Sequence, residues 1–111
     1  MENIDFNQLI EDCLNAAKTH LKSAYNSAKP FAEHSFKQFA EDAIFLAKLR
    51  LANEIDDAEL KHRLENQKIA LSNVLLTIKG IGLIEAQNTI NDVISIVSNA
   101  VLGSLNFALP V

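Results

Sequence analysis

Apolar residues recur every three or four positions along most of the chain, which is the spacing of one face of an α-helix. The first such stripe predicts a helix over residues 5–28. Its members are Phe6, Ile10, Cys13, Ala17, Leu21, Ala24 and Ala28. The residue before a proline avoids helical backbone angles, so Pro30 is expected to end this helix. A second helix is predicted over residues 31–53, because proline is favoured in a first turn.

Two further helices are predicted, over residues 57–79 and 83–109. A turn is favoured between the second and third helices, although the pattern leaves one long helix open. The apolar stripe changes phase after Ala58, and Asp56 followed by Glu59 has the form of an N-cap. Gly80 is the expected C-cap of the third helix. Helices of about 20 residues are about 30 Å long. The pattern therefore predicts an all-α antiparallel four-helix bundle that forms a single domain over residues 1–111.

Composition fits a folded protein of this size. Of the 111 residues, 49 % are apolar and 22 % are charged, which is ordinary for a globular domain. The net charge of −4 disfavours nucleic acid and anionic membranes as partners. The single cysteine rules out a disulfide within the chain and fits a reducing, cytoplasmic setting. The N-terminal residues are acidic before they are apolar, which is unlike a secretory signal.

Charge is spread unevenly along the chain. Residues 1–17 hold four acids and no base, and every lysine and arginine lies between Lys18 and Lys79. Residues 80–111 hold only two ionisable side chains, Glu85 and Asp92. The predicted fourth helix is therefore nearly uncharged, which sets it apart from the other three.

The uncharged run covers the nineteen residues from Val93 to Val111. That length reaches the lower limit for a membrane-spanning helix. Serines and asparagines interrupt the run, and Gly103 and Pro110 weaken the helix, so a membrane span is disfavoured. An amphipathic helix explains the run better, with isoleucine and valine on one side and small neutral side chains on the other.

A small, neutral face suits burial against another protein, because a helix face in water usually carries lysine or glutamate. We therefore expect this helix to be covered on both sides, by its own core and by a second copy or another protein. Alanines and serines at four-residue spacing also permit close helix approach. The predicted interaction residues are Ser95, Asn99, Ala100, Ser104 and Ala108. Two alternatives stay open, namely a helix central to its own monomer and association with a membrane.

The stretch from Ile78 to Ile90 contains a Gly80-Ile81-Gly82 turn followed by Ala86. It resembles the helix-hairpin-helix motif of DNA-binding and repair proteins, in which backbone N–H groups of the turn hold a DNA phosphate. The resemblance implies Lys79, Gly80 and Gly82 as phosphate contacts. This chain departs from the motif in having Leu83, Ile84 and Glu85 after the second glycine and no base after Lys79. A turn that only lets two helices pack is the favoured interpretation.

Residue patterns that carry catalysis are scarce. The histidines His20, His34 and His62 are far apart in sequence, and Glu59 with His62 forms one isolated Glu-x-x-His pair, where a di-iron bundle needs two. Cys13 falls on the apolar stripe of the first helix, which indicates an inert thiol. We therefore expect no catalytic residues, no metal and no cofactor.

These observations predict a non-catalytic structural or interaction protein that self-associates through its C-terminal helix. A membrane-associated protein and, less favoured, a DNA-backbone binder are the alternatives. The Gly80-Ile81-Gly82, Ala86 and Ile90-Asn91 positions, with the ending Asn106-Phe107-Ala108-Leu109, also resemble small helical proteins encoded in prophages.

Overall fold

The computed structural model describes residues 5–104 of the chain, with side chains described for residues 5–101. This part consists of four α-helices and one short 3₁₀ turn. In chain order they are α1 (Phe6–Leu21), η1 (Lys22–Ala24), α2 (Tyr25–Leu51), α3 (Asp57–Leu76) and α4 (Leu83–Ser104). The all-α prediction is therefore confirmed over the described residues.

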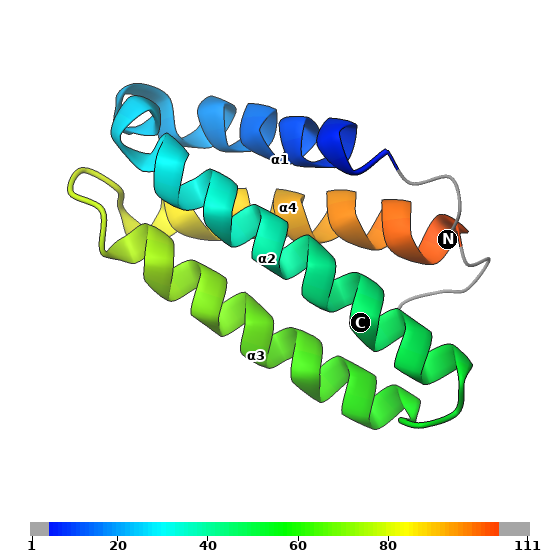
Figure 1. The fold of residues 1–111 in the computed structure, drawn as a ribbon. Coiled ribbons are helices and arrows are strands. Elements are labelled where there is room, and N and C mark those ends of the chain that lie inside the picture. Colours follow the sequence, from blue (N-terminus) through cyan, green and yellow to red (C-terminus); the bar gives the residue numbers. More distant parts are fainter. Residues whose placement is uncertain (1–4, 105–111) are drawn as a thin grey trace.

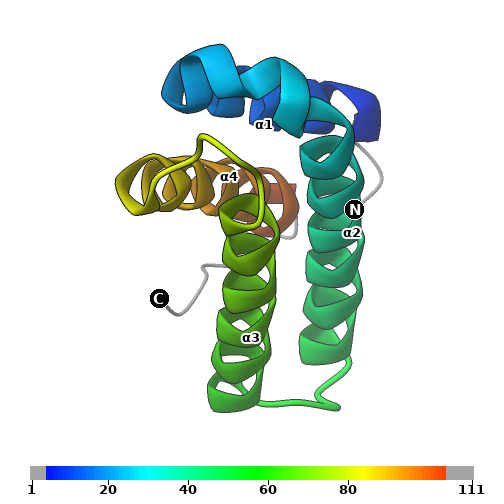
Figure 2. The same cartoon turned by 90° about the vertical axis from the view of Figure 1, so that its left-hand side faces the viewer.

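The helices form two antiparallel pairs, α1 with α4 and α2 with α3 (Figure 1). α1 lies diagonally opposite α3, and the two do not approach each other. The pairs are inclined to one another, so α1 and α4 lie across one end of α2 and α3 (Figure 2). The packing is consistent with the predicted antiparallel four-helix bundle, with the far end of the α2–α3 hairpin projecting from it.

One hydrophobic core joins all four helices. Five of the eight buried residues of α2 are alanines, which lets the neighbouring helices approach α2 closely. The larger side chains of Phe36 and Phe39, also on α2, belong to the same core. From α4 the buried side chains are Ala86, Thr89, Ile90, Val93, Val97 and Val101. The buried face of α4 therefore runs from its first turn to the last side chain that is described.

The first and third helices each begin at an aspartate cap, of which Asp56 was predicted. Asp5 caps α1, because its carboxylate accepts the N–H of Gln8 at 3.1 Å. Asp56 caps α3 in the same way, accepting the N–H of Glu59 at 2.8 Å. The turn predicted between the second and third helices is therefore present, and Arg50 bonds Asp57 across it at 2.6 Å. α2 and α3 are two helices rather than one.

The predicted boundary at Pro30 is wrong. α1 ends at Leu21, Lys22 adopts a positive φ of 52°, and Pro30 lies inside α2. The chain bends at Lys22, and Ala28 beyond the bend is still buried in the core. Pro30 lacks an N–H for the carbonyl of Asn26, but Asn26 is exposed and water can satisfy that carbonyl.

The second half of the chain agrees more closely with prediction. α3 ends at Leu76, three residues before the predicted end, and its C-cap is Thr77 rather than the predicted Gly80. Gly80 adopts a positive φ of 94° in the turn that follows. α4 begins at Leu83 as predicted. Its predicted continuation over residues 105–109 lies outside the described residues.

Candidate interaction surface

The outward side of α4 carries few charged side chains. Opposite the buried face, Asn88, Asn91, Ser95 and Asn99 follow one another at three- and four-residue spacing, and all four are exposed. We call these four residues the neutral face. Asp92 lies at the edge of this face, four residues after Asn88 and three before Ser95, and it is paired with His20 of α1. The neutral face is thus an exposed helix surface without the lysines or glutamates that normally cover one.

The predicted interaction residues do not all share this surface. Ser95 and Asn99 belong to the neutral face. Ala100 is half-buried and packs against the core, so its small size serves packing within the chain. Residue 100 lies about 100° around the helix from residue 99, so it faces a different side of α4 from the neutral face. Ser104 is the last residue of α4, but its side chain and Ala108 lie outside the described side chains.

A groove borders the neutral face, where α4 packs against α3. It measures about 330 Å³ and is lined by Glu65, Lys68, Ile69 and Ser72 of α3 and by Gln87, Ile90 and Asn91 of α4. Ile69 leaves 56 % of its surface exposed there. The groove therefore offers an apolar contact beside a neutral polar strip, with one acid and one base close together.

The glycine turn between α3 and α4 packs against η1. A Cβ added at Gly80 would lie 3.8 Å from the Cβ of Ala24, so the turn and η1 are in contact. At Gly82 an added Cβ would lie 2.5 Å from a carboxylate oxygen of Glu85. The carboxylate of Glu85 therefore lies at the first turn of α4. A phosphate that approached this turn would be repelled by its negative charge. Lys79 is exposed on the same turn.

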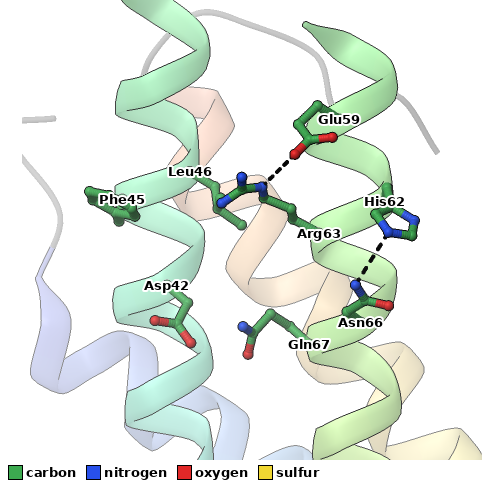
Figure 3. Close-up of a pocket in the computed structure, with 8 residues that line it drawn as sticks. All are labelled: Asp42, Phe45, Leu46, Glu59, His62, Arg63, Asn66 and Gln67. Carbon is green, nitrogen blue, oxygen red and sulfur yellow. Dashed lines mark hydrogen bonds and ion pairs between the residues drawn. The ribbon is translucent and has the colours of Figure 1, made fainter. Parts of the chain in front are cut away.

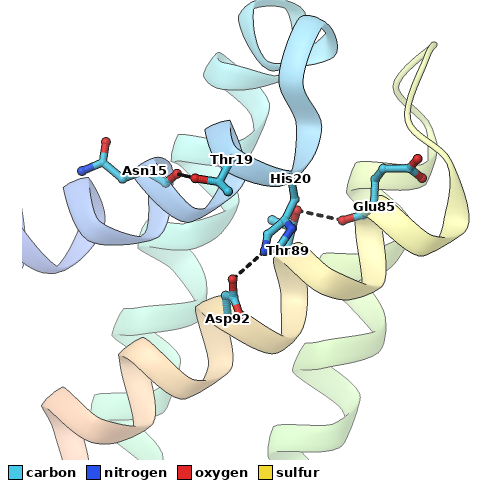
Figure 4. Close-up of polar contacts among 6 residues, drawn as sticks. All are labelled: Asn15, Thr19, His20, Glu85, Thr89 and Asp92. Atoms are coloured by element: carbon cyan, nitrogen blue, oxygen red, sulfur yellow. Dashed lines mark hydrogen bonds and ion pairs between the residues drawn. The ribbon is translucent and has the colours of Figure 1, made fainter.

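A polar contact between α1 and α4 joins two distant parts of the chain. His20 Nε2 lies 2.6 Å from Asp92 Oδ2 (Figure 4), which makes an ion pair when the imidazole is protonated. Beside it, the hydroxyl of Thr89 donates to the carbonyl oxygen of Glu85 at 2.8 Å. This bond satisfies Thr89, which is fully buried.

We expect the His20–Asp92 contact to hold α1 on α4 with a modest free energy. A double-mutant cycle with His20→Ala and Asp92→Ala should give a coupling of about 0.5–1 kcal/mol, because both side chains are partly exposed. Urea unfolding would measure it. The matched control is Lys37–Glu33, a 3.1 Å pair within α2 alone, for which about 0.3–0.5 kcal/mol is expected. A coupling near zero for His20–Asp92 would contradict its role between the helices.

A second groove lies between α2 and α3 on the projecting hairpin (Figure 3). It measures about 440 Å³, and its lining includes Asp42, Phe45, Glu59 and His62. Glu59 accepts from Arg63 at 2.8 Å, so its carboxylate is already paired. The described residues contain no group of three or more His, Cys, Asp or Glu side chains placed to hold a metal ion. The Glu59–His62 pair therefore remains without further ligands in that part of the chain.

Neither α4 nor any other helix among residues 5–104 has the length and apolar content that a membrane crossing requires. Comparisons with protein-family models, with curated proteins and with solved structures give no significant match.

Proposed function

We propose that this chain is a non-catalytic helical bundle that assembles with further copies of itself through the neutral face of α4 and the adjoining α3–α4 groove. The uncharged, exposed neutral face carries the proposal. Small amide and hydroxyl side chains can hydrogen-bond across an interface and leave little charge to desolvate.

The charges in the groove beside the neutral face are suited to a second copy. The chain carries a net charge of −4, so two copies repel each other over most of their surface. The neutral face allows them to approach without that repulsion. Glu65 and Lys68 line the groove beside it. In a two-fold arrangement the acid of one copy faces the base of the other, which makes the groove complementary to itself.

The absence of catalysis belongs to the same proposal. Cys13 is fully buried. His20 is engaged by Asp92, and His62 lies within 3.5 Å of Asn66 Nδ2. These side chains are occupied in packing or pairing, which supports a structural use of the fold.

The direct test is the mass in solution by light scattering behind a sizing column. We expect at least a dimer for the unmodified chain. In a Ser95→Lys/Asn99→Lys variant, two ammonium groups buried without partners cost at least about 3 kcal/mol. The dissociation constant should therefore rise at least about 100-fold.

The matched control is Asn7→Lys/Asn15→Lys, which adds the same charge at exposed positions of α1. It should keep the assembly. A monomer for the unmodified chain, or equal weakening by both variants, would refute self-association through the neutral face.

Backbone binding to DNA through the glycine turn is the weaker proposal. The carboxylate of Glu85 lies against Gly82, and Lys79 is the last base of the chain. A Lys79→Glu variant tests it, because binding that is sensitive to salt and lost in this variant is what the hairpin would require.

A further inference from the structure

Four helix ends meet at one end of the molecule. α1 ends and α2 begins there, joined by η1, and α3 ends and α4 begins there, joined by the glycine turn (Figures 1 and 2). The contact of Ala24 with Gly80 brings the two connections together. We call residues 18–29 and 76–85 the basic pole.

Charge at the basic pole is opposite to that of the rest of the chain. Its 22 residues contain Lys18, Lys22, Lys29 and Lys79 and a single acid, Glu85, which gives a net charge of +3. The remaining residues carry six bases and thirteen acids, a net charge of −7. All four lysines of the pole are exposed. An acidic protein thus presents one strongly basic end.

Large apolar side chains project from this same end. Leu76, Leu83 and Ile84 are 40 %, 57 % and 69 % exposed. Ile84 is the most exposed of the large hydrophobic residues among the described side chains. Leu83 and Ile84 occupy the first turn of α4, a position where polar residues usually satisfy the free N–H groups. Leu83 and Ile84 do not belong to the core, whose first residue in α4 is Ala86.

We propose that the basic pole docks on an anionic lipid surface. Leu83 and Ile84 enter the boundary between headgroups and acyl chains, while the lysines lie among the lipid phosphates and carboxylates. A lipid surface fits better than nucleic acid, because apolar tips gain nothing from a phosphate backbone and Glu85 covers the first turn of α4. Ile84 lies four residues before Asn88 on the same side of α4, so the pole adjoins the neutral face, and docking and self-association are tested by separate measurements.

Insertion is measured with a tryptophan placed at the tip. The chain contains no tryptophan, so Ile84→Trp gives a single fluorescent reporter. With vesicles of phosphatidylcholine and phosphatidylserine, we expect a blue shift and quenching by brominated acyl chains. The control is Phe45→Trp, which is 57 % exposed on the projecting hairpin and should not be quenched. Equal quenching of both reporters would overturn the assignment of the pole.

Charge dependence is measured with two variants of equal net charge. Lys22→Glu/Lys79→Glu reverses the pole, and Lys48→Glu/Lys61→Glu makes the same change at exposed positions outside it. The first should lower vesicle binding at least about tenfold, and the second should leave it within about twofold. Raising the salt concentration should also weaken binding.

Three results would overturn the proposal. They are equal binding to vesicles of phosphatidylcholine alone, no binding to phosphatidylserine vesicles at low salt, and a preference for duplex DNA over these vesicles at the same salt concentration. Because sedimentation with vesicles is read separately from the mass in solution, failure of docking and failure of self-association are distinguishable.

Discussion

Replacing Phe36 by alanine is expected to lower the free energy of unfolding by about 3–5 kcal/mol. Phe36 is fully buried in the core. On its own helix it is flanked at four-residue spacing by Ala32 and Ala40, which are too small to fill the space that the ring leaves. Most domains are stable by only about 5–15 kcal/mol, so this one change removes a large share of the total.

Urea denaturation followed by circular dichroism would measure the loss. Phe45→Ala serves as the control, since it removes the same ring from the same helix at a position that is 57 % exposed. It should cost less than about 1 kcal/mol. Similar losses for the two variants would mean that Phe36 is not enclosed by the core.

Cys13 is expected to react about a thousandfold more slowly with thiol reagents in the folded protein than in the unfolded one at about pH 8. Burial raises the pKa of the Cys13 thiol from 9.0 to about 12, and the nearby charge of Asp12 adds to the effect. The thiolate is the reactive form, so its scarcity protects the residue. Iodoacetamide labelling followed by mass spectrometry, with and without urea, measures the ratio. Comparable rates in both states would contradict a buried thiol.

The same pKa shift makes stability depend on pH. Because the folded-state pKa is higher than the unfolded one, the thiol's contribution is complete below about pH 9 and is lost as the pH rises toward about 12. The slope from this one group is at most about 1.4 kcal/mol per pH unit. A Cys13→Ala variant lacks this group, so its stability should fall less steeply over the same range.

Sequence patterns located most of the helical elements. The carboxylate at Asp56 and the apolar phase change after Ala58 predicted the start of α3, because capping is a local interaction between residues three apart. The start of α4 after Gly82 was predicted from the Gly80-Ile81-Gly82 turn that precedes it. Both signals are local, so they needed no knowledge of the tertiary packing.

The bend at Lys22 had no comparable local signal. A lysine in the left-handed region is unfavourable by itself, and Pro30 offered a more obvious helix boundary nearby. Ala28 falls on the apolar stripe in the sequence and is also buried in the core of the structure beyond the bend. Periodicity along one helix therefore does not reveal a bend between α1 and α2.

The positions of the candidate interaction residues on α4 could be predicted only in part, and their role in an interface stays a prediction. The neutral residues Ser95 and Asn99 could be assigned to an outward face from helical spacing alone, whereas Ala100 required knowledge of which side faces the core. The basic pole was missed, because its lysines are divided between two segments about 50 residues apart. Mapping each lysine onto the nearest predicted helix end would have indicated it.

The pairing of α1 with α4 has a consequence for the order of folding. His20 and Asp92 are 72 residues apart, so these two helices meet only after a long loop has closed. The α2–α3 hairpin joins neighbours in the chain and needs no such closure. During synthesis α1, α2 and α3 can therefore begin to pack on one another early, because each contacts its neighbour in the chain. The side of α1 that α4 covers stays exposed until α4 emerges, so a chaperone that binds apolar helices can reach it during that interval.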